Sequence, residues 1–331
     1  MMLAGWQLKL SILLAFLLFN ITANACDICG CFMGITPYDN QSSVSLLYRY
    51  RSFNGYGGQK HSVFPTGARF FPVGNQLNAP LTEHDGNATD FEAYRALELR
   101  GKYFLSRRVE LNAIIPYNSN SEQFNNNLSS IAGIGDVTIH AGYHLLRKLD
   151  QKTINQRLIL GAGIKVPSGK STTVNEDGDR YSTLIQTGTG STDGFVYFNY
   201  LAGYKRSGIS LTTTYKFNGE NKAHESIANS TTSFLNLFYT AAFKNDVKVI
   251  PSLQFAYEYS AGEKIGDVET GEHVMNNLMT GVGVDVFVKN IGLNMAVQTA
   301  GWSAADDHPR PAGRVVLGVS YNLNQLYYLM N

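Results

Sequence analysis

The sequence predicts an all-β fold: a transmembrane, antiparallel, up-and-down β-barrel of about twelve strands, with short periplasmic turns and long extracellular loops. Three observations indicate this fold. Segments of about ten residues alternate between an apolar face and a polar or small face, short and long connections join them in turn, and aromatic residues gather at both ends of the apolar faces. Such strands are about twice the usual soluble length and long enough, when tilted, to cross a bilayer.

The first 25 residues predict a secretory signal peptide. Lys9 supplies the positive flank, residues 10–19 the apolar core, and residues 23–25 an Ala-Asn-Ala cleavage site. Beyond this stretch no apolar run reaches the ~18 residues of a membrane-spanning helix, so strands would have to supply any membrane crossing. The expected organisation is a signal peptide (1–25), a periplasmic N-terminal segment (26–41) and an outer-membrane barrel (42–331).

Composition and charge narrow the expected partners. Charged residues make up 16% of the chain, below the roughly 25% typical of soluble domains. The formal net charge of +1 gives no reason to expect nucleic acid as a partner. We expect outer-membrane lipid, a small-molecule solute and the barrel assembly machinery as partners, in the outer membrane of a Gram-negative bacterium.

Alternating segments run from residue 42 to near the end of the chain. The clearest hairpin lies within 133–169: in 136–145 the odd positions are Val, Ile, Ala, Tyr and Leu, and the even positions are Asp, Thr, His, Gly and His. Period-two alternation is typical of an extended strand with two unlike faces. The expected strands are 43–53, 91–104, 109–118, 136–146, 157–166, 195–205, 209–218, 233–243, 247–259, 277–288, 291–300 and 314–323.

The connections between these segments alternate in length. Those after even-numbered segments are mostly short, such as residues 106–108 and 289–290, whereas those after odd-numbered segments are long and polar, up to the stretch 54–90. Short turns on one side, long loops on the other and an even strand count are typical of outer-membrane barrels. This pattern places both termini on the periplasmic side.

Aromatic residues on the apolar faces form two groups. One group lies near the short turns and the other at the opposite strand ends, with aliphatic residues between them, as two membrane interfaces would select. Arg95 is an exception on an apolar face and is expected at the outer rim. The first group is Tyr103, Tyr143, Tyr204, Phe243 and Tyr321; the second is Tyr48, Tyr50, Tyr117, Tyr215, Phe217, Tyr257 and Tyr259.

The opposite, polar faces are expected to line the lumen. Mixed charges at this density would pair across the interior, which predicts a constricted or plugged barrel. Arg49 and Arg51 are expected to pair with Glu92 and Glu98 on the neighbouring strand. His140 and His144, ~13 Å apart along one strand, are expected to be hydrogen-bonded lumen residues and too far apart to hold one metal ion. The candidate lumen residues are Arg49, Arg51, Glu98, Arg100, Asp136, His140, His144 and Lys165.

Three glycine-containing motifs follow in order within about sixty residues. They are Gly-Ile-Gly-Asp-Val at 133–137, Lys-Val-Pro-Ser-Gly-Lys at 165–170 and Leu-Ile-Gln-Thr-Gly-Thr-Gly-Ser-Thr-Asp at 184–193. They resemble the Gly-x-Gly-Asp, Pro-Thr-Gly and Gln-Pro-Gly-Thr-Gly-Ser motifs of an outer-membrane barrel family linked to the meta pathway of phenol degradation. That family is distantly similar to the long-chain fatty-acid and aromatic-hydrocarbon channels. Ser168 and Thr187 depart from the pattern. The resemblance implies passive transport of a small, hydrophobic or aromatic solute.

All three cysteines, Cys26, Cys29 and Cys31, lie in one short stretch that is not part of the family pattern. Three states are compatible with it: a disulfide in an oxidising periplasm, a thiolate site for Cu(I) or Zn(II), or acylation of Cys26. Histidines beside carboxylates in long loops are further candidate metal ligands. Those histidines are His84, His273 and His308, with His224 beside Glu225 as a fourth.

The sequence therefore favours a passive outer-membrane transporter that needs no cofactor. One alternative is a barrel that binds or exports a transition metal through the cysteines and loop histidines, with Cu or Zn at the cysteine cluster. A second alternative is a structural barrel without transport. No enzymatic activity is expected, because no Gly-x-Ser-x-Gly elbow is present and His140 has Thr138 and Gly142 as neighbours on its face.

Overall fold

The computed structural model describes the chain from residue 41 to residue 323, with gaps. The described residues are 41–54, 90–124, 126–148, 154–175, 178, 180–181, 183–261, 263–266, 268–269, 274–303 and 310–323. No helix in this part of the chain is long and apolar enough to cross a membrane.

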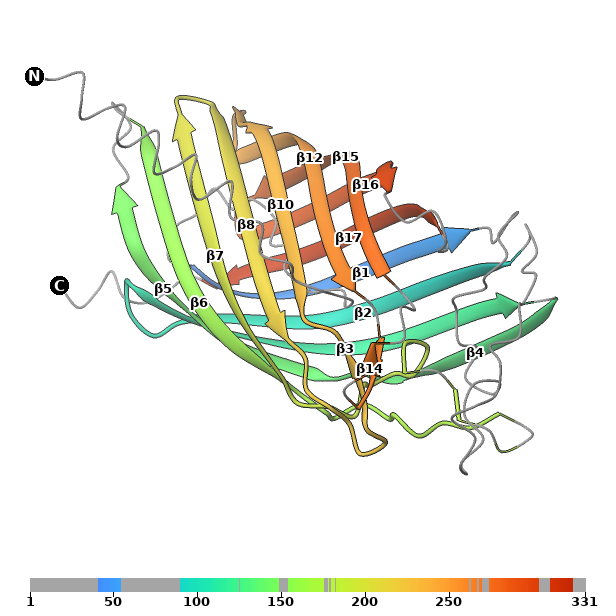
Figure 1. The fold of residues 1–331 in the computed structure, drawn as a ribbon. Coiled ribbons are helices and arrows are strands. Elements are labelled where there is room, and N and C mark those ends of the chain that lie inside the picture. The colour runs from blue at the N-terminus through green and yellow to red at the C-terminus, as the bar shows by residue number, and fades with distance from the viewer. Residues whose placement is uncertain are drawn as a thin grey trace, which may run out of the picture.

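Twelve long strands form a closed antiparallel barrel (Figure 1), which confirms the predicted fold class. Each long strand pairs with the next one along the chain, β10 pairs with β12, and β1 pairs with β17 to close the ring. The strands are β1 (Ser42–Asn54), β2 (Phe91–Phe104), β3 (Val109–Phe124), β5 (Val137–Lys148), β6 (Asn155–Val166), β7 (Asp193–Tyr204), β8 (Ser207–Phe217), β10 (Ser230–Tyr239), β12 (Val247–Ala261), β15 (Val274–Val288), β16 (Ile291–Ser303) and β17 (Arg310–Leu323).

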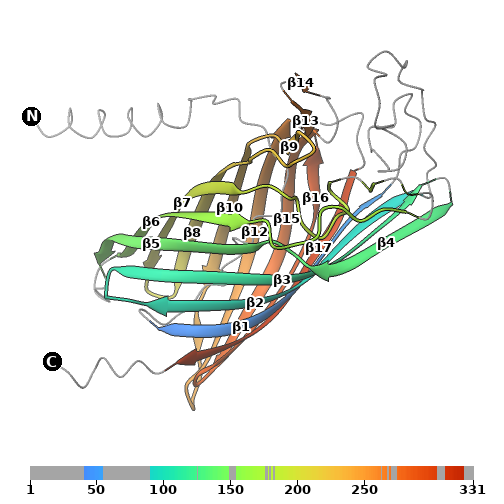
Figure 2. The same ribbon diagram turned by 90° about the horizontal axis from the view of Figure 1, so that it is seen from below.

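Four of the five short strands were not expected from the sequence, whereas the fifth, β11, lies within the expected segment 233–243. β4 (Asn127–Ile134) pairs with the second half of β3 and extends that hairpin beyond the neighbouring strands (Figure 2). A separate three-stranded sheet joins β9 (Glu225–Ile227), β13 (Glu263–Ile265) and β14 (Val268–Glu269), and β11 (Ala241–Ala242) pairs with β12. The expectation of loops at 119–135 and 260–276 was therefore wrong in part. Residues 119–123 are polar on both faces, so the pattern that marks a membrane strand ends before the strand does.

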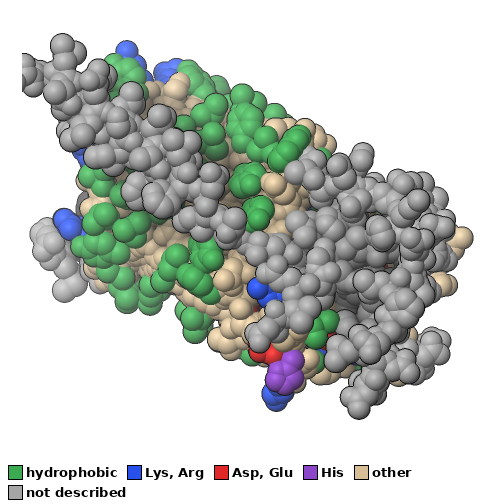
Figure 3. Space-filling view, viewed as in Figure 1, with side chains coloured by type: hydrophobic (Ala, Val, Ile, Leu, Met, Phe, Trp, Pro, Cys, Tyr) green, Lys and Arg blue, Asp and Glu red, His purple; other side chains and the backbone are tan. Residues whose placement is uncertain are grey.

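The two faces of the barrel wall are sorted as the alternation predicted. Outward-pointing apolar residues such as Leu160 (46% exposed) and Val282 (57% exposed) are open to the surroundings, whereas inward-pointing residues on the same strands are largely buried. Hydrophobic side chains accordingly gather on the outer surface of the strands (Figure 3). An apolar exterior around a polar interior reverses the order of a soluble protein and suits a hydrocarbon surrounding.

The outward aromatic residues lie where two interfaces were predicted. Tyr103, Tyr143 and Tyr204 are exposed near the short turns, and Phe217 and Tyr257 are exposed toward the opposite ends of β8 and β12. These two groups of rings flank the aliphatic band, as expected for aromatic girdles.

Arg95, the exception on an apolar face, is accommodated by polar and aromatic neighbours. Its Nη1 donates to Ser121 Oγ at 3.1 Å, and its guanidinium lies 5.6 Å from the centroid of the Tyr50 ring. Ser121 belongs to the polar second half of β3. The charge is therefore directed toward a strand end and away from the aliphatic band, as predicted.

The short turns use the left-handed backbone region that tight hairpins require. Asn245 and Asp246, in the four-residue connection between β11 and β12, have φ values of 62° and 57°, and Lys205 and Lys289, in the two-residue turns after β7 and β15, have 55° and 53°. Positive φ at the central residues matches the turn to the twist of the flanking strands. Asparagine and aspartate tolerate this conformation better than most residues.

Candidate functional site

The structure places all eight candidate lumen residues on the inner face of the barrel. Arg51, Glu98, Asp136, His144 and Lys165 are buried, and the other three are partly buried. Arg49 Nη2 lies 2.5 Å from Glu98 Oε1, and Arg100 contacts the other carboxylate oxygen of Glu98. The predicted pairing of Arg49 with the neighbouring strand is thus present.

Arg51 does not pair with the neighbouring strand, so that expectation was wrong. Its Nη2 lies 2.6 Å from Glu258 Oε2 on β12, and Arg314 on β17 contacts Glu258 Oε1. Going round the wall, β17, β16 and β15 separate β1 from β12. The three side chains therefore meet across the lumen, a contact that agrees with the predicted constriction. We call Arg51, Glu258 and Arg314 the lumen bridge.

Glycines on β15 make room beside this bridge. Gly281 lies in register between Gln254 on β12 and Gln298 on β16. Gln298 Nε2 donates to Gln254 Oε1 at 2.8 Å, and Arg314 Nη1 donates to Gln298 Oε1 at 3.1 Å. A Cβ at Gly281 would lie 2.1 Å from the carbonyl oxygen of Val297, too close to be accommodated. Because Gly281 has no side chain, Gln254 and Gln298 can form a hydrogen bond with each other across β15.

A second inner surface is apolar and aromatic. Ile159, Phe195 and Tyr197 form a buried cluster, and the His140 ring lies 5.7 Å from the Phe195 ring and 5.5 Å from the Tyr197 ring between centroids. We call these four residues the aromatic wall. The rings lie over glycines: Tyr197 is in register with Gly161, and Phe195 with Gly163. A Cβ on either glycine would lie within 2.3–2.5 Å of a ring atom.

The two lumen histidines differ from each other. His144 Nε2 lies 3.1 Å from Glu110 Oε2, as expected for a hydrogen-bonded lumen residue. His140 packs against aromatic rings, and its Nδ1 has no hydrogen-bond partner among the described residues, so the prediction of a hydrogen-bonded His140 was wrong for that atom. His140 lies in register with Gly163 and packs against the rings of Phe195 and Tyr197, so its surroundings are largely apolar.

A charged network occupies the opposite end of the barrel from the short turns. Lys165 Nζ lies 3.1 Å from Asp136 Oδ2 and 2.7 Å from Asp193 Oδ2, and Lys216 Nζ lies 3.1 Å from the same oxygen of Asp193. These residues come from the ends of four consecutive wall strands, β5 to β8. Their charges alternate in space, so each is compensated by a neighbour of opposite sign.

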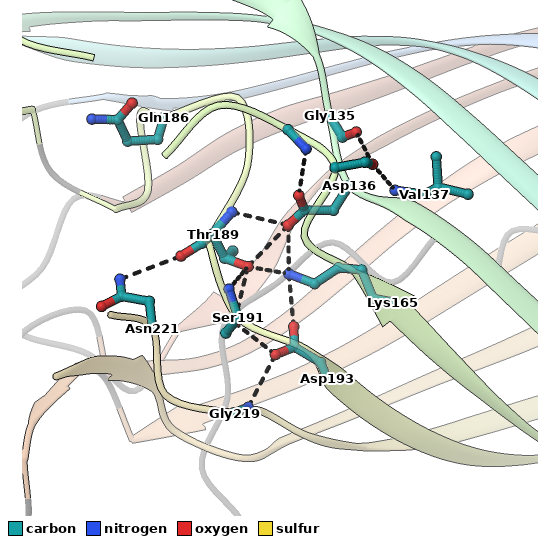
Figure 4. A network of polar contacts seen from close by, with 12 residues as sticks. Gly135, Asp136, Val137, Lys165, Gln186, Thr189, Ser191, Asp193, Gly219 and Asn221 are labelled. Carbon is teal, nitrogen blue, oxygen red and sulfur yellow. Dashed lines mark hydrogen bonds and ion pairs between the residues drawn. The ribbon is translucent and has the colours of Figure 1, made fainter. Parts of the chain in front are cut away.

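This network holds the connection between β6 and β7, residues 167–192, which we call the pinned loop. Asp136 accepts hydrogen bonds from the backbone N–H of Gly169 at 3.0 Å and of Thr189 at 2.9 Å (Figure 4). Between these points the loop passes along the inner face of β3, where Asn118 Nδ2 donates to the carbonyl of Thr187 at 2.9 Å and Asn120 Nδ2 to that of Ile185 at 3.1 Å. The pinned loop therefore lies against the inside of the wall.

The three glycine motifs converge on this network. Residues 133–137 supply Asp136, residues 165–170 supply Lys165 and Gly169, and residues 184–193 supply Thr189 and Asp193. Gly188 packs so closely on Gly169 that a Cβ on Gly188 would lie 2.6 Å from the Gly169 Cα and 2.6 Å from Asp136 Oδ1. The motifs thus encode one packing unit, in which glycines permit the backbones to touch.

Most of the candidate metal ligands lie outside the described residues. Cys26, Cys29, Cys31, His84, His273 and His308 all lie outside the described residues. His224 is described; its Nδ1 lies 2.5 Å from Glu220 Oε1 at an exposed position. Within the described ranges, no group of three or more histidine, cysteine, aspartate or glutamate side chains is placed to hold a metal ion.

Together, a closed twelve-stranded barrel, an apolar outer band, two aromatic girdles and a charged interior define an outer-membrane β-barrel protein. Its sequence matches, over residues 85–316, the model of the family described as "Putative MetA-pathway of phenol degradation", and the chain belongs to that family. The match confirms the resemblance drawn from the glycine motifs. No curated protein is significantly similar to the chain.

Solved outer-membrane barrels share this architecture. The COG4313 outer membrane channel from Pseudomonas putida F1 superposes with a TM-score of 0.60 at 14% identity, covering 90% of this chain and 100% of that one. The β domain of the Bordetella autotransporter BrkA superposes with a TM-score of 0.45 at 10% identity, covering 86% of this chain and 100% of that one. The first likeness agrees with the fold.

Proposed function

We propose that the protein is a passive outer-membrane channel for small solutes with apolar, especially aromatic, groups. The observation that carries this proposal is the aromatic wall. The lumen of an outer-membrane barrel is ordinarily polar. Here Ile159, Phe195 and Tyr197 are buried on the inner face, so part of the lumen is lined by apolar side chains.

Apolar residues recur along the rest of the inner face. They form separate buried clusters between the polar side chains, one near the short turns and others further along the barrel. The members of these clusters are Ile250 and Phe287; Leu47, Ala296 and Val316; and Phe234, Ala256 and Met279. A solute with an apolar body could therefore exchange one apolar contact for the next, which lowers the cost of passing a narrow and partly dehydrated lumen.

The same surroundings favour a channel over an enzyme. His140 is the histidine of the aromatic wall, and its described ring contacts are with Phe195 and Tyr197. A histidine that activates a nucleophile needs a hydroxyl or thiol within hydrogen-bond reach. The proposal accordingly assigns His140 to packing.

Swelling of liposomes that contain the purified barrel tests the proposal. L-Phenylalanine and L-glutamine are both zwitterions of similar length, so they differ mainly in the apolar character of the side chain. We expect faster swelling with phenylalanine than with glutamine. Tyr197→Ala should lower this ratio, because it removes an aromatic contact and widens the bore above Gly161.

A change on the lipid face supplies the control. Tyr204→Ala removes an exposed tyrosine from the same strand but from the outer face, and should leave the ratio unchanged. Swelling no faster than in protein-free liposomes would overturn the channel. Equal ratios for the wild type and Tyr197→Ala would overturn the role of the aromatic wall.

A further inference from the structure

The lumen bridge carries more positive than negative charge. Arg51 and Arg314 share the single carboxylate of Glu258, and all three side chains are at least nine-tenths buried. The other polar contacts of the two arginines are with neutral groups: Arg314 Nη1 with Gln298 Oε1 at 3.1 Å, and Arg51 Nη2 with Met275 Sδ at 3.7 Å. One guanidinium charge is therefore left without a counter-charge among the described residues, which is costly in a buried place.

The same two arginines also have unused hydrogen-bond donors. The Nε of Arg51 and the Nε of Arg314 are both buried and have no partner in the described part of the chain. A buried donor without an acceptor costs about 1–3 kcal/mol. Two such donors beside an uncompensated positive charge suit a monoanion with two acceptor oxygens.

Aromatic rings flank these donors. The Arg51 guanidinium carbon lies 4.6 Å from the centroid of the Phe53 ring, and that of Arg314 lies 5.7 Å from the Phe234 ring. Phe234 packs with Ala256 and Met279 in a buried apolar cluster. A ligand whose charged end meets the arginines would therefore place its remaining atoms against apolar side chains.

We propose that Arg51 and Arg314 form a binding site for an apolar monocarboxylate, an aromatic acid such as benzoate being the simplest example. The carboxylate accepts from the two Nε–H groups, and the ring packs against Phe53 and Phe234. The planar guanidinium suits carboxylate oxygens better than a lysine ammonium does. This inference rests on the proposed channel function for the route by which a ligand arrives, but binding itself requires only the folded barrel.

Glu258 sets the affinity of the site. Its carboxylate holds both guanidinium groups by their Nη atoms, so it orients the arginines and also competes with an incoming anion for their charge. Glu258→Gln keeps the shape of the side chain and removes its charge. This variant should bind benzoate more tightly than the wild type, whereas loss of an arginine should weaken binding.

Equilibrium dialysis of radiolabelled benzoate against the folded barrel in a zwitterionic detergent tests the site. We expect one saturable site in the wild type. Acetate should compete poorly because it lacks the aromatic ring, and benzyl alcohol because it lacks the carboxylate. Arg314→Gln should weaken binding at least tenfold. Arg314→Lys should weaken it similarly, because it keeps the charge but lacks Nε–H. Arg180→Gln, which removes a cation from the pinned loop, is the matched control and should not change binding.

The outcomes separate this site from the channel. Heat-modifiable migration of each variant establishes that it has folded. No saturable benzoate binding to folded wild-type protein, or equal affinity in the wild type and Arg314→Gln, would overturn the site. Arg314→Lys binding as well as the wild type would reduce the proposal to general electrostatic attraction and overturn the donor assignment. Binding without liposome swelling would retain the site and remove the channel.

Discussion

At the scale of single residues, glycines and the rings above them set the width of the lumen. Tyr197 lies over Gly161 and Phe195 over Gly163, each pair in direct register across β6 and β7. The alternation of the sequence predicted that Gly161 and Gly163 share the inward face of Lys165. It did not predict that rings would pack over these glycines, because the pairing of a ring with a glycine depends on the register between two strands, which the pattern of one strand does not contain.

Two residues that depart from the family motifs are explained by local hydrogen bonds. Ser168 stands where threonine was expected; its Oγ donates to the carbonyl of Gly135 at 3.0 Å and accepts from the N–H of Val137 at 2.9 Å. Either hydroxyl residue could make these bonds. Thr187 stands where proline was expected, and its Oγ1 donates to the carbonyl of Lys170 at 3.2 Å. This contact is one that proline could not make, so it compensates for the lost ring.

At the outer face, one substitution checks the assignment of the wall. Val282→Arg should destabilise the folded barrel by ~2–4 kcal/mol, because it places a charge at the middle of the apolar band. Val282→Ala, at the same position, should cost much less, since lipid fills the space that the smaller side chain leaves. Urea titration of the folded protein in lipid vesicles measures both. Similar losses for the two variants would mean that Val282 does not face hydrocarbon.

At the scale of elements, the strands that cross the membrane could be predicted and the segments beyond it could not. All twelve long strands overlap the expected segments. β9, β13 and β14 have only two or three residues, too few to show an alternation, and in β4 serine and glycine interrupt the apolar pattern. The convergence of the three motifs on Asp136 could likewise not be predicted from the sequence. Their spacing does not show that the chain between them folds back along the inside of β3.

The pinned loop gives a prediction for this scale. Gly188→Ala should release the loop from the wall, because the added methyl group would collide with Asp136 and with the backbone of Gly169. Limited trypsin digestion of the folded protein should then cleave after Arg180 several times faster than in the wild type. Gly194→Ala is the control, because a Cβ there meets no atom within 4 Å. Unchanged cleavage in Gly188→Ala would show that Gly–Gly contact does not hold the loop.

At the scale of the whole molecule, the order of strands around the ring decides which lumen charges meet. Arg49 pairs with the neighbouring strand, as a local reading predicted, but Arg51 pairs across the lumen. The difference arises because Glu258 and Arg314 come within reach only once the wall has curved into a closed ring. Sequence alone identified Arg51 as a lumen residue, yet it could not supply a partner from β12, which three strands separate from β1 round the wall.

The orientation of the barrel can be read by chemical labelling. In a background in which Cys26, Cys29 and Cys31 are replaced by serine, Lys222→Cys should react with an impermeant maleimide on intact cells. Asp246→Cys should react only after the outer membrane is permeabilised. Both positions are exposed, one in the connection between β8 and β9 and the other in the short turn before β12. The reverse pattern would invert the proposed topology.

The lumen bridge also bears on how the barrel is made. Arg51 and Glu258 are 207 positions apart in the chain. Their contact needs β1 to have joined β17, and the intervening strands to be paired back to β12. Bringing such distant positions together lowers the entropy of the chain, and the free energy of strand pairing has to offset this loss first. We therefore expect the ion pair to be among the last contacts to form during assembly, once the first and last strands have paired.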